Sequence, residues 1–200
     1  MTRRASPSAF SLHAWVDESL RFDGADGTGI YILAAVVCDP SACDTPRDQL
    51  RSLRLRGQER LHWRDEDDGR RTRLTAAVAG IDLAGVVIVG TPVQPSKQER
   101  ARRHCLTRLL HELEQVGVTN VWLEARNPSL NARDREMVEA LRGQRVISPA
   151  IRIDIARPLE EPMLWASDVI AGAANAARGG NSVWRDAFAQ QIHEIEIDIR

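Results

Sequence analysis

The chain has 200 residues, 43% of them hydrophobic, and its 27 basic and 28 acidic side chains give a formal net charge of -1. These values fit one globular domain and exclude a strongly basic chain that binds nucleic acid through bulk charge alone. The three cysteines, Cys38, Cys43 and Cys105, are irregularly spaced and lack a CxxC pair. They exclude a disulfide framework or a zinc knuckle and favour a reducing compartment.

Residues 1–10 contain two arginines but no apolar core, so they do not form a signal peptide. No apolar run approaches the roughly 20 residues that a helix needs to span a bilayer. We therefore expect a cytoplasmic protein with no membrane partner. Its residues 1–10 are expected to be flexible, and residues 11–200 to form a single domain.

Three apolar segments in the first half of the chain, residues 12–18, 30–38 and 83–90, predict strands. A turn rich in Gly and Asp over residues 21–29 predicts that the first two strands form a hairpin. Residues 44–80 are charged and predict a largely helical insertion between the second and third strands. Short connections between successive strands favour antiparallel pairing of these three strands.

Helices and strands alternate in the second half of the chain. The expected elements are an amphipathic helix over 96–116, a strand over 118–125, a helix over 131–142, a strand over 150–156, an apolar helix over 162–177, and a short helix and alternating strand within 181–200. Such alternation is typical of crossover connections between parallel strands. The sequence thus predicts an α/β fold with a mixed sheet flanked by helices.

The apolar helix over 162–177 contains a single ionisable side chain, Asp168. A helix that is apolar on almost every side is buried, so its carboxylate loses hydration. A cation or several hydrogen-bond donors must compensate for that loss, or the carboxyl group stays protonated. An arginine such as Arg152 is the structural alternative to a functional cation.

Two further acids end predicted strands, and each lies two residues after a tryptophan on the same face. They are Asp17 after Trp15 and Glu124 after Trp122. If Asp17, Glu124 and Asp168 converge, their like charges conflict, and a bound divalent cation removes the conflict. Oxygen ligands favour Mg or Mn, which support phosphodiester hydrolysis. The structural alternative is that strand-end acids sit at turns or cap helices.

Three other side chains are candidates for the same site. Glu18 faces away from Asp17 in a continuing strand and becomes a metal ligand only if the chain bends. His62 is a candidate proton shuttle or outer metal ligand, although isolated histidines are often structural. Arg126 contacts a substrate phosphate or pairs with a nearby acid. By contrast, the arginines at 100, 102 and 103 are expected to form a solvated helix face.

A family resemblance rests on three short motifs: Asp17-Glu18-Ser19 at the end of the first strand, Leu61-His62-Trp63 in the insertion, and Ala166-Ser167-Asp168 on the apolar helix. They resemble motifs of an uncharacterised family with a ribonuclease-H-like fold, and the similarity spans roughly residues 12–178. It implies a ribonuclease-H-like sheet and a metal-dependent nuclease-like site at Asp17, Glu124 and Asp168. Leu20 stands where the family usually has Gly, and Glu124 stands where Asp is common.

These observations lead to one main hypothesis and two alternatives. The main hypothesis is a Mg- or Mn-dependent nuclease in which Asp17 and Asp168 are the central ligands, Glu124 is the third and a metal-bound water is the nucleophile. The first alternative is a non-catalytic ribonuclease-H-like binding or assembly module. Its site acids would pair with arginines, and its C-terminal strand would form a homodimer by edge pairing. The second alternative is a hydrolase of small nucleotides.

Overall fold

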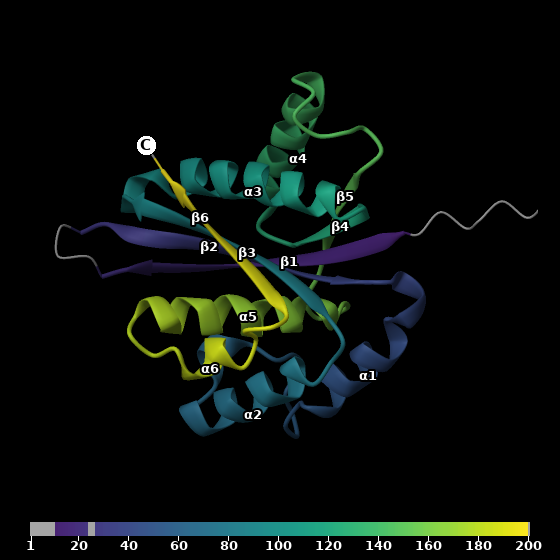
Figure 1. The fold of residues 1–200 in the computed structure, drawn as a ribbon, viewed down its shortest axis with the longest axis vertical. Coiled ribbons are helices and arrows are strands. Elements are labelled where there is room, and N and C mark those ends of the chain that lie inside the picture. Colours follow the sequence, from purple (N-terminus) through teal and green to yellow (C-terminus); the bar gives the residue numbers. More distant parts are fainter. Residues whose placement is uncertain (1–10, 24–26, 200) are drawn as a thin grey trace, which may run out of the picture.

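A computed structural model describes residues 11–23 and 27–199. One six-stranded sheet, with the strand order β5-β4-β1-β2-β3-β6, lies between two layers of helices (Figure 1). This confirms the expected α/β fold with a mixed sheet flanked by helices. The flexible segment predicted at 1–10 lies outside the described residues, as do residues 24–26 of the predicted turn.

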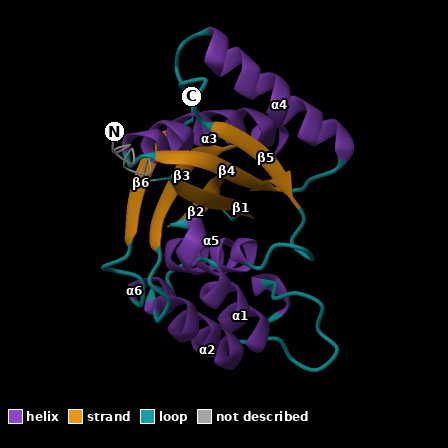
Figure 2. Ribbon diagram, turned by 90° about the vertical axis from the view of Figure 1, so that its right-hand side faces the viewer, coloured by secondary structure: helices purple, strands orange, loops and turns teal. Residues whose placement is uncertain are grey.

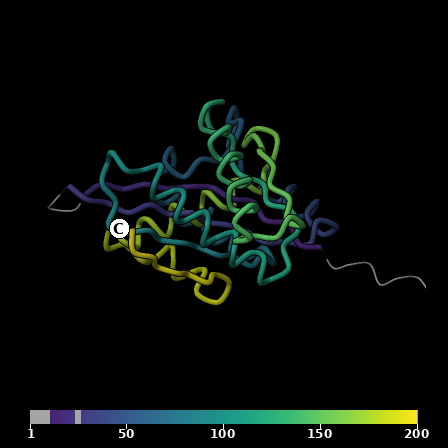
Figure 3. Tube along the Cα trace, turned by 90° about the horizontal axis from the view of Figure 1, so that it is seen from above, coloured from purple at the N-terminus to yellow at the C-terminus, as the bar shows by residue number. Residues whose placement is uncertain are grey.

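The sheet combines antiparallel and parallel pairs. Its strands are β1 (Leu12–Phe22), β2 (Gly29–Cys38), β3 (Ala84–Val93), β4 (Val118–Glu124), β5 (Arg152–Ala156) and β6 (Ile192–Asp198). The first three strands pair antiparallel, as expected, whereas β4 runs parallel to β1, β5 to β4 and β6 to β3. The edge strands β5 and β6 lie on opposite sides of the molecule (Figure 3).

The helices form one layer on each face of the sheet. They are α1 (Asp44–Ser52), α2 (Asp68–Ala79), α3 (Gln98–Gln115), α4 (Pro128–Gly143), α5 (Met163–Arg178) and α6 (Val183–Asp186), with short 3-10 turns η1 (Pro40–Ala42), η2 (Trp63–Asp65) and η3 (Pro95–Lys97). Helices α3 and α4 cover one face, and α5 covers the other with α1, α2 and α6 beneath it (Figure 2). Because α5 is covered by the sheet on one side and by helices on the other, its composition is apolar nearly all round.

Helix α4 begins at Pro128, three residues before the expected start at residue 131. The Asn127 side chain accepts a hydrogen bond from the backbone N–H of Leu130 at 3.0 Å, and proline is well tolerated in the first turn. The cap thus starts the helix close to the end of β4. Asp134 of this helix then lies close enough to β1 for Arg102 to contact both Asp134 and Glu18.

Strand β1 is longer than its parallel neighbour β4, and this difference creates the site. The β1–β4 pairing ends at Val16 and Leu123, whereas β1 continues along β2 as far as Phe22. The expected strand therefore extends four residues beyond residue 18, because the hairpin with β2 supports it. From Asp17 onward, β1 therefore has no paired strand on the side where β4 lies.

No helix in the described part of the chain is both long enough and apolar enough to cross a membrane.

Candidate active site

Asp17 and Glu124 come next along β1 and β4 after the last paired residues of the two strands. Neighbouring strands lie about 4.8 Å apart, so these two acids start from adjacent backbone positions. Trp15 and Trp122 pair directly two residues earlier and belong to the core on the α5 side of the sheet. Since side chains alternate along a strand, Asp17 and Glu124 face α5 as well.

Asp168 approaches this point from α5. The preceding residue, Ser167, is fully buried, and its hydroxyl donates a hydrogen bond to the carbonyl of Trp15 at 2.7 Å. This bond fixes α5 against β1 one residue before Asp168. The Asp168 carboxylate accepts the backbone N–H of Trp63 at 2.6 Å. It forms no ion pair with an arginine in the described residues, so the pairing with Arg152 considered above is not observed.

A glycine on α5 allows the segment carrying His62 and Trp63 to lie this close. A Cβ atom at Gly172 would overlap the indole ring of Trp63. The ring also packs edge-on against Trp184, with 5.2 Å between ring centroids. His62 itself contacts Asp65, with 3.1 Å between Nδ1 and the carboxylate.

One cavity of about 240 Å³ brings the candidate residues together. We call it the acid cavity; its ionisable lining residues are Asp17, Glu18, His62, Arg64, Arg102, Glu124, Arg126 and Asp168. All the side chains proposed from the sequence therefore line a single space. Arg64, which was not predicted from the sequence, also lines the cavity and has no hydrogen-bond or ion-pair partner among the described residues.

The acids on the α5 side repel one another. Asp17 is only 9% exposed; burial raises its pKa well above the usual value of 3.8, and the charges of Asp168 and Glu124 raise it further. Burial also raises the pKa of Asp168, although the hydrogen bond from Trp63 opposes this effect. Glu124 has one cationic contact, with 3.4 Å between its carboxylate and Arg60. Both side chains of that pair are partly exposed, so the contact is weak.

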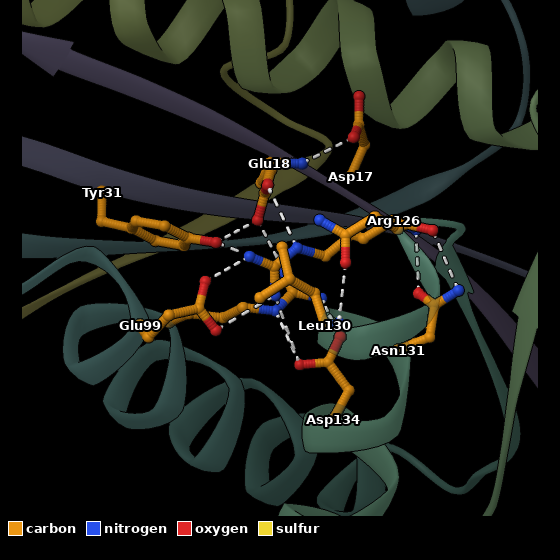
Figure 4. A network of polar contacts seen from close by, with 10 residues as sticks. Asp17, Glu18, Tyr31, Glu99, Arg126, Leu130, Asn131 and Asp134 are labelled. Carbon is orange, nitrogen blue, oxygen red and sulfur yellow. Dashed lines mark hydrogen bonds and ion pairs between the residues drawn. The ribbon is translucent and has the colours of Figure 1, made fainter.

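The acid on the other face of β1 has a different environment. Glu18 points away from α5 and hydrogen-bonds to Tyr31 and Arg102, while Asp17 points toward α5 (Figure 4). The bend that would bring Glu18 to the metal ligands is absent, because β1 continues straight through this position. The expected role of Glu18 as a metal ligand does not fit this placement.

Arg102 connects Glu18 to α4 through a two-pronged ion pair. Its guanidinium donates to both oxygens of Asp134, at 2.9 and 2.8 Å, and each of the two residues is only 4% exposed. Although burial alone would lower the pKa of Arg102, hydrogen bonds to Asp134 and the neighbouring anions raise it. The prediction of a solvated arginine at position 102 was wrong. Arg102 precedes Leu106 by four residues and so lies on the buried face of α3.

Arg126 belongs to the same network and also lines the acid cavity. It pairs with Glu99, and its guanidinium lies 3.6 Å from Asp134 and 3.8 Å from Glu18 (Figure 4). Asn131 holds its backbone, accepting from the N–H at 2.9 Å and donating to the carbonyl at 3.0 Å. Of the two roles considered for Arg126, pairing with acids is the one observed.

The three acids of the acid cavity fit a divalent cation in donor type but not yet in arrangement. Within residues 11–23 and 27–199, no three His, Cys, Asp or Glu side chains are already arranged to hold a metal ion together. The donors nevertheless have suitable chemistry, because Asp17, Glu124 and Asp168 offer only oxygen ligands. The carboxylates match a hard cation in type and must turn toward a common point to bind it.

No protein-family model matches the chain, and no curated protein matches it. The site must therefore be interpreted from its own geometry and chemistry.

Proposed function

We propose that the protein is a Mg²⁺- or Mn²⁺-dependent nuclease that hydrolyses phosphodiester bonds of nucleic acid. One observation carries the proposal: the carboxylates of Asp17, Glu124 and Asp168 line one cavity, where burial and the charges of the other two raise the pKa of Asp17. Three acids so close are costly in their ionised forms unless a cation binds them. An acidic, partly open cavity with unpaired Arg64 beside it suits a metal ion and a phosphate.

The proposed fold is the ribonuclease-H-like one. Three antiparallel strands followed by parallel strands, with Asp17 on the first strand and Asp168 on the last long helix, support this proposal. The resemblance of the Asp17-Glu18-Ser19 motif to an uncharacterised ribonuclease-H-like family supports it independently.

In the proposed mechanism Asp17, Asp168 and Glu124 hold the cation, and a backbone N–H orients Asp168. A bound Mg²⁺ or Mn²⁺ supplies Lewis-acid stabilisation of the phosphate and lowers the pKa of water. Arg64 binds the phosphate group, and His62 exchanges a proton with the reacting water or leaving oxygen. Burial beneath α5 keeps bulk water away from Asp17.

The decisive experiment is a cleavage assay with labelled DNA, RNA and a dinucleotide in the presence of Mn²⁺ or Mg²⁺. We expect cleavage of nucleic acid, and we expect Asp17→Asn and Asp168→Asn to reduce it to below about 1% of wild type, since metal chemistry is lost. The matched control is Asp82→Asn, an exposed acid remote from the cavity, which should retain full activity. No cleavage of any substrate with either metal would contradict the proposal, and cleavage of the dinucleotide alone would favour a small-nucleotide hydrolase.

His62 has a separate test. His62→Ala should lower kcat by about 100-fold, because a general acid or base contributes roughly 10²–10⁴. It should leave the rise in melting temperature caused by Mn²⁺ unchanged. An unchanged kcat would remove His62 from the mechanism without affecting the metal site.

The second candidate is a non-catalytic binding or assembly module, and the contact between Arg60 and Glu124 favours it. A melting curve with and without Mn²⁺ separates the two. A metal site raises the melting temperature by mass action, whereas an arginine-paired site does not respond. Homodimerisation through the edge strand β6 stays a prediction of this second candidate and is tested by sedimentation of the wild-type protein.

A further inference from the structure

A groove separates α3 from α4 on the face of the sheet opposite α5. It encloses about 650 Å³ and has an apolar floor that includes Met137 and Leu141. Its rim is basic: the lining residues include three arginines, Arg103, Arg108 and Arg133, and one acid, Glu136. We call it the α3–α4 groove.

Two of these arginines are free to bind a ligand. Arg103 and Arg133 are exposed, and neither forms a hydrogen bond or ion pair through its side chain with any described residue. The neighbouring Arg102 is fully engaged by Asp134 and Glu18. Arginines from both helices line the same groove, and the charge of Arg133 also acts on nearby Glu99, where it helps to lower the pKa of that carboxyl. Such arginines suit the oxygens of phosphate groups.

A smaller cavity has lining residues in common with both the α3–α4 groove and the acid cavity. It encloses about 290 Å³, and it shares Arg103 and Arg133 with the groove and Arg102 with the acid cavity. The groove residues on α3 run from Arg103 to His111, which corresponds to about 12 Å at 1.5 Å per residue.

We propose that the α3–α4 groove binds the phosphodiester backbone of a single nucleic-acid strand, with Arg103 and Arg133 contacting its phosphates. That the cleaved bond of this strand lies in the acid cavity rests on the proposed nuclease function; binding in the groove does not. A site with four acids and three arginines attracts a polyanion weakly by itself. The groove supplies the attraction that the acid cavity lacks.

The test measures binding of a labelled 20-nucleotide single strand by fluorescence anisotropy in EDTA, where no metal-dependent cleavage occurs. For the double variant Arg103→Gln/Arg133→Gln we expect Kd to rise at least 10-fold. We also expect the slope of log K against log salt to fall by about 1.4, or about 0.7 for each phosphate contact of a single strand. Parallel DNA and RNA strands of the same sequence show which backbone is preferred.

The matched control is Arg56→Gln/Arg73→Gln, which removes the same charge from two exposed, unpartnered arginines on the α5 side of the sheet. We expect its Kd to stay within about twofold of wild type. Equal losses in the two double variants would overturn the proposal, because net charge alone would then explain binding. A polyglutamate peptide that binds as tightly as the oligonucleotides would also overturn it and make an acidic polypeptide the ligand.

The two proposals fail separately. If the groove variant loses binding but the wild-type protein cleaves nothing with Mn²⁺, the groove assignment stands and the nuclease proposal fails. If the wild type cleaves nucleic acid and the groove variant binds and cleaves like the control, the nuclease proposal stands and the groove assignment fails.

Discussion

The two faces of β1 at the site carry carboxylates in opposite electrostatic situations. On the α3 side, Glu18 and Asp134 share Arg102, and Arg126 lies within 4 Å of both. On the α5 side, Asp17 lies close to two other acids, and among the described residues only Glu124 of these three forms an ion pair with an arginine. Both regions bury charge at the same end of the sheet.

This difference separates a structural role from a ligand-binding role. Buried carboxylates that are matched by arginines hold α3, α4 and β1 together and leave little capacity for a ligand. Buried carboxylates that face one another destabilise the folded chain and are relieved by a cation. Such an arrangement is typical of functional sites, where stability is lower than it could be.

We call the α3 side of β1, where Glu18 and Asp134 share Arg102, the matched side. The largest expected effect comes from breaking it. Arg102→Met leaves the buried Asp134 without its main partner and should reduce the free energy of unfolding by about 3–5 kcal/mol. Urea denaturation measures the change. The double variant Arg102→Met/Asp134→Leu removes both charges and should recover most of the loss. A single-variant loss below about 1 kcal/mol would show that the pair does not hold the two helices together.

Next in size is the packing that positions Asp168. Gly172→Ala places a methyl group into the ring of Trp63, and overpacking of this kind costs about 1–3 kcal/mol. Because Trp63 also donates to Asp168, Mn²⁺ should then raise the melting temperature less than in wild type. Gly143→Ala is the control: nothing lies near a Cβ at this helix end, so it should be neutral or stabilising. Equal stability of the two variants would contradict the close contact.

We call the α5 side of β1, with Asp17, Glu124 and Asp168, the mismatched side. In metal-free protein we expect its acids to cause a pH effect of intermediate size. Because the pKa of Asp17 is raised in the folded state, its protonated form contributes stability that is fully present below pH 3.8 and is lost as the pH rises through the raised pKa. Asp17→Asn cannot ionise, so its melting temperature should exceed that of wild type by several degrees near pH 8 in EDTA. It should also fall less between pH 4 and pH 8. A wild-type protein that becomes more stable relative to Asp17→Asn as the pH rises would contradict the account.

The smallest effect concerns Arg60, which contacts Glu124. Arg60→Gln removes a partly exposed ion pair and should change the free energy of unfolding by less than about 0.5 kcal/mol. Freeing Glu124 should strengthen Mn²⁺ binding by about twofold, as measured by calorimetry. Weaker Mn²⁺ binding in this variant would indicate that Arg60 supports the site instead of competing with a metal.

The mismatched side was far easier to predict from the sequence than the matched side. Asp17 and Glu124 follow hydrophobic runs of sequence, and Asp168 interrupts an apolar helix, so each is conspicuous in its local context. Helix and strand patterns also gave the element order and the antiparallel start of the sheet. Pattern alone did not give the extra length of β1, which depends on its hairpin with β2.

The matched side depends on contacts between distant residues. Arg102 and Asp134 lie 32 positions apart, and neither is unusual among the charged residues of its helix. The one local signal was the spacing of Arg102 from Leu106, which places it on the buried face of α3. Arg64 was missed for a related reason, because only the fold brings η2 to the mouth of the acid cavity.

The central claim is that Asp17, Glu124 and Asp168 hold one divalent cation. The most direct test is an anomalous difference map from crystals of the wild-type protein soaked in Mn²⁺. The account predicts a peak within about 2.2 Å of a carboxylate oxygen of each of the three residues, and no such peak in Asp17→Asn crystals. Wild-type crystals with no Mn²⁺ peak in the acid cavity, or with Arg60 still bound to Glu124 at saturating Mn²⁺, would contradict it.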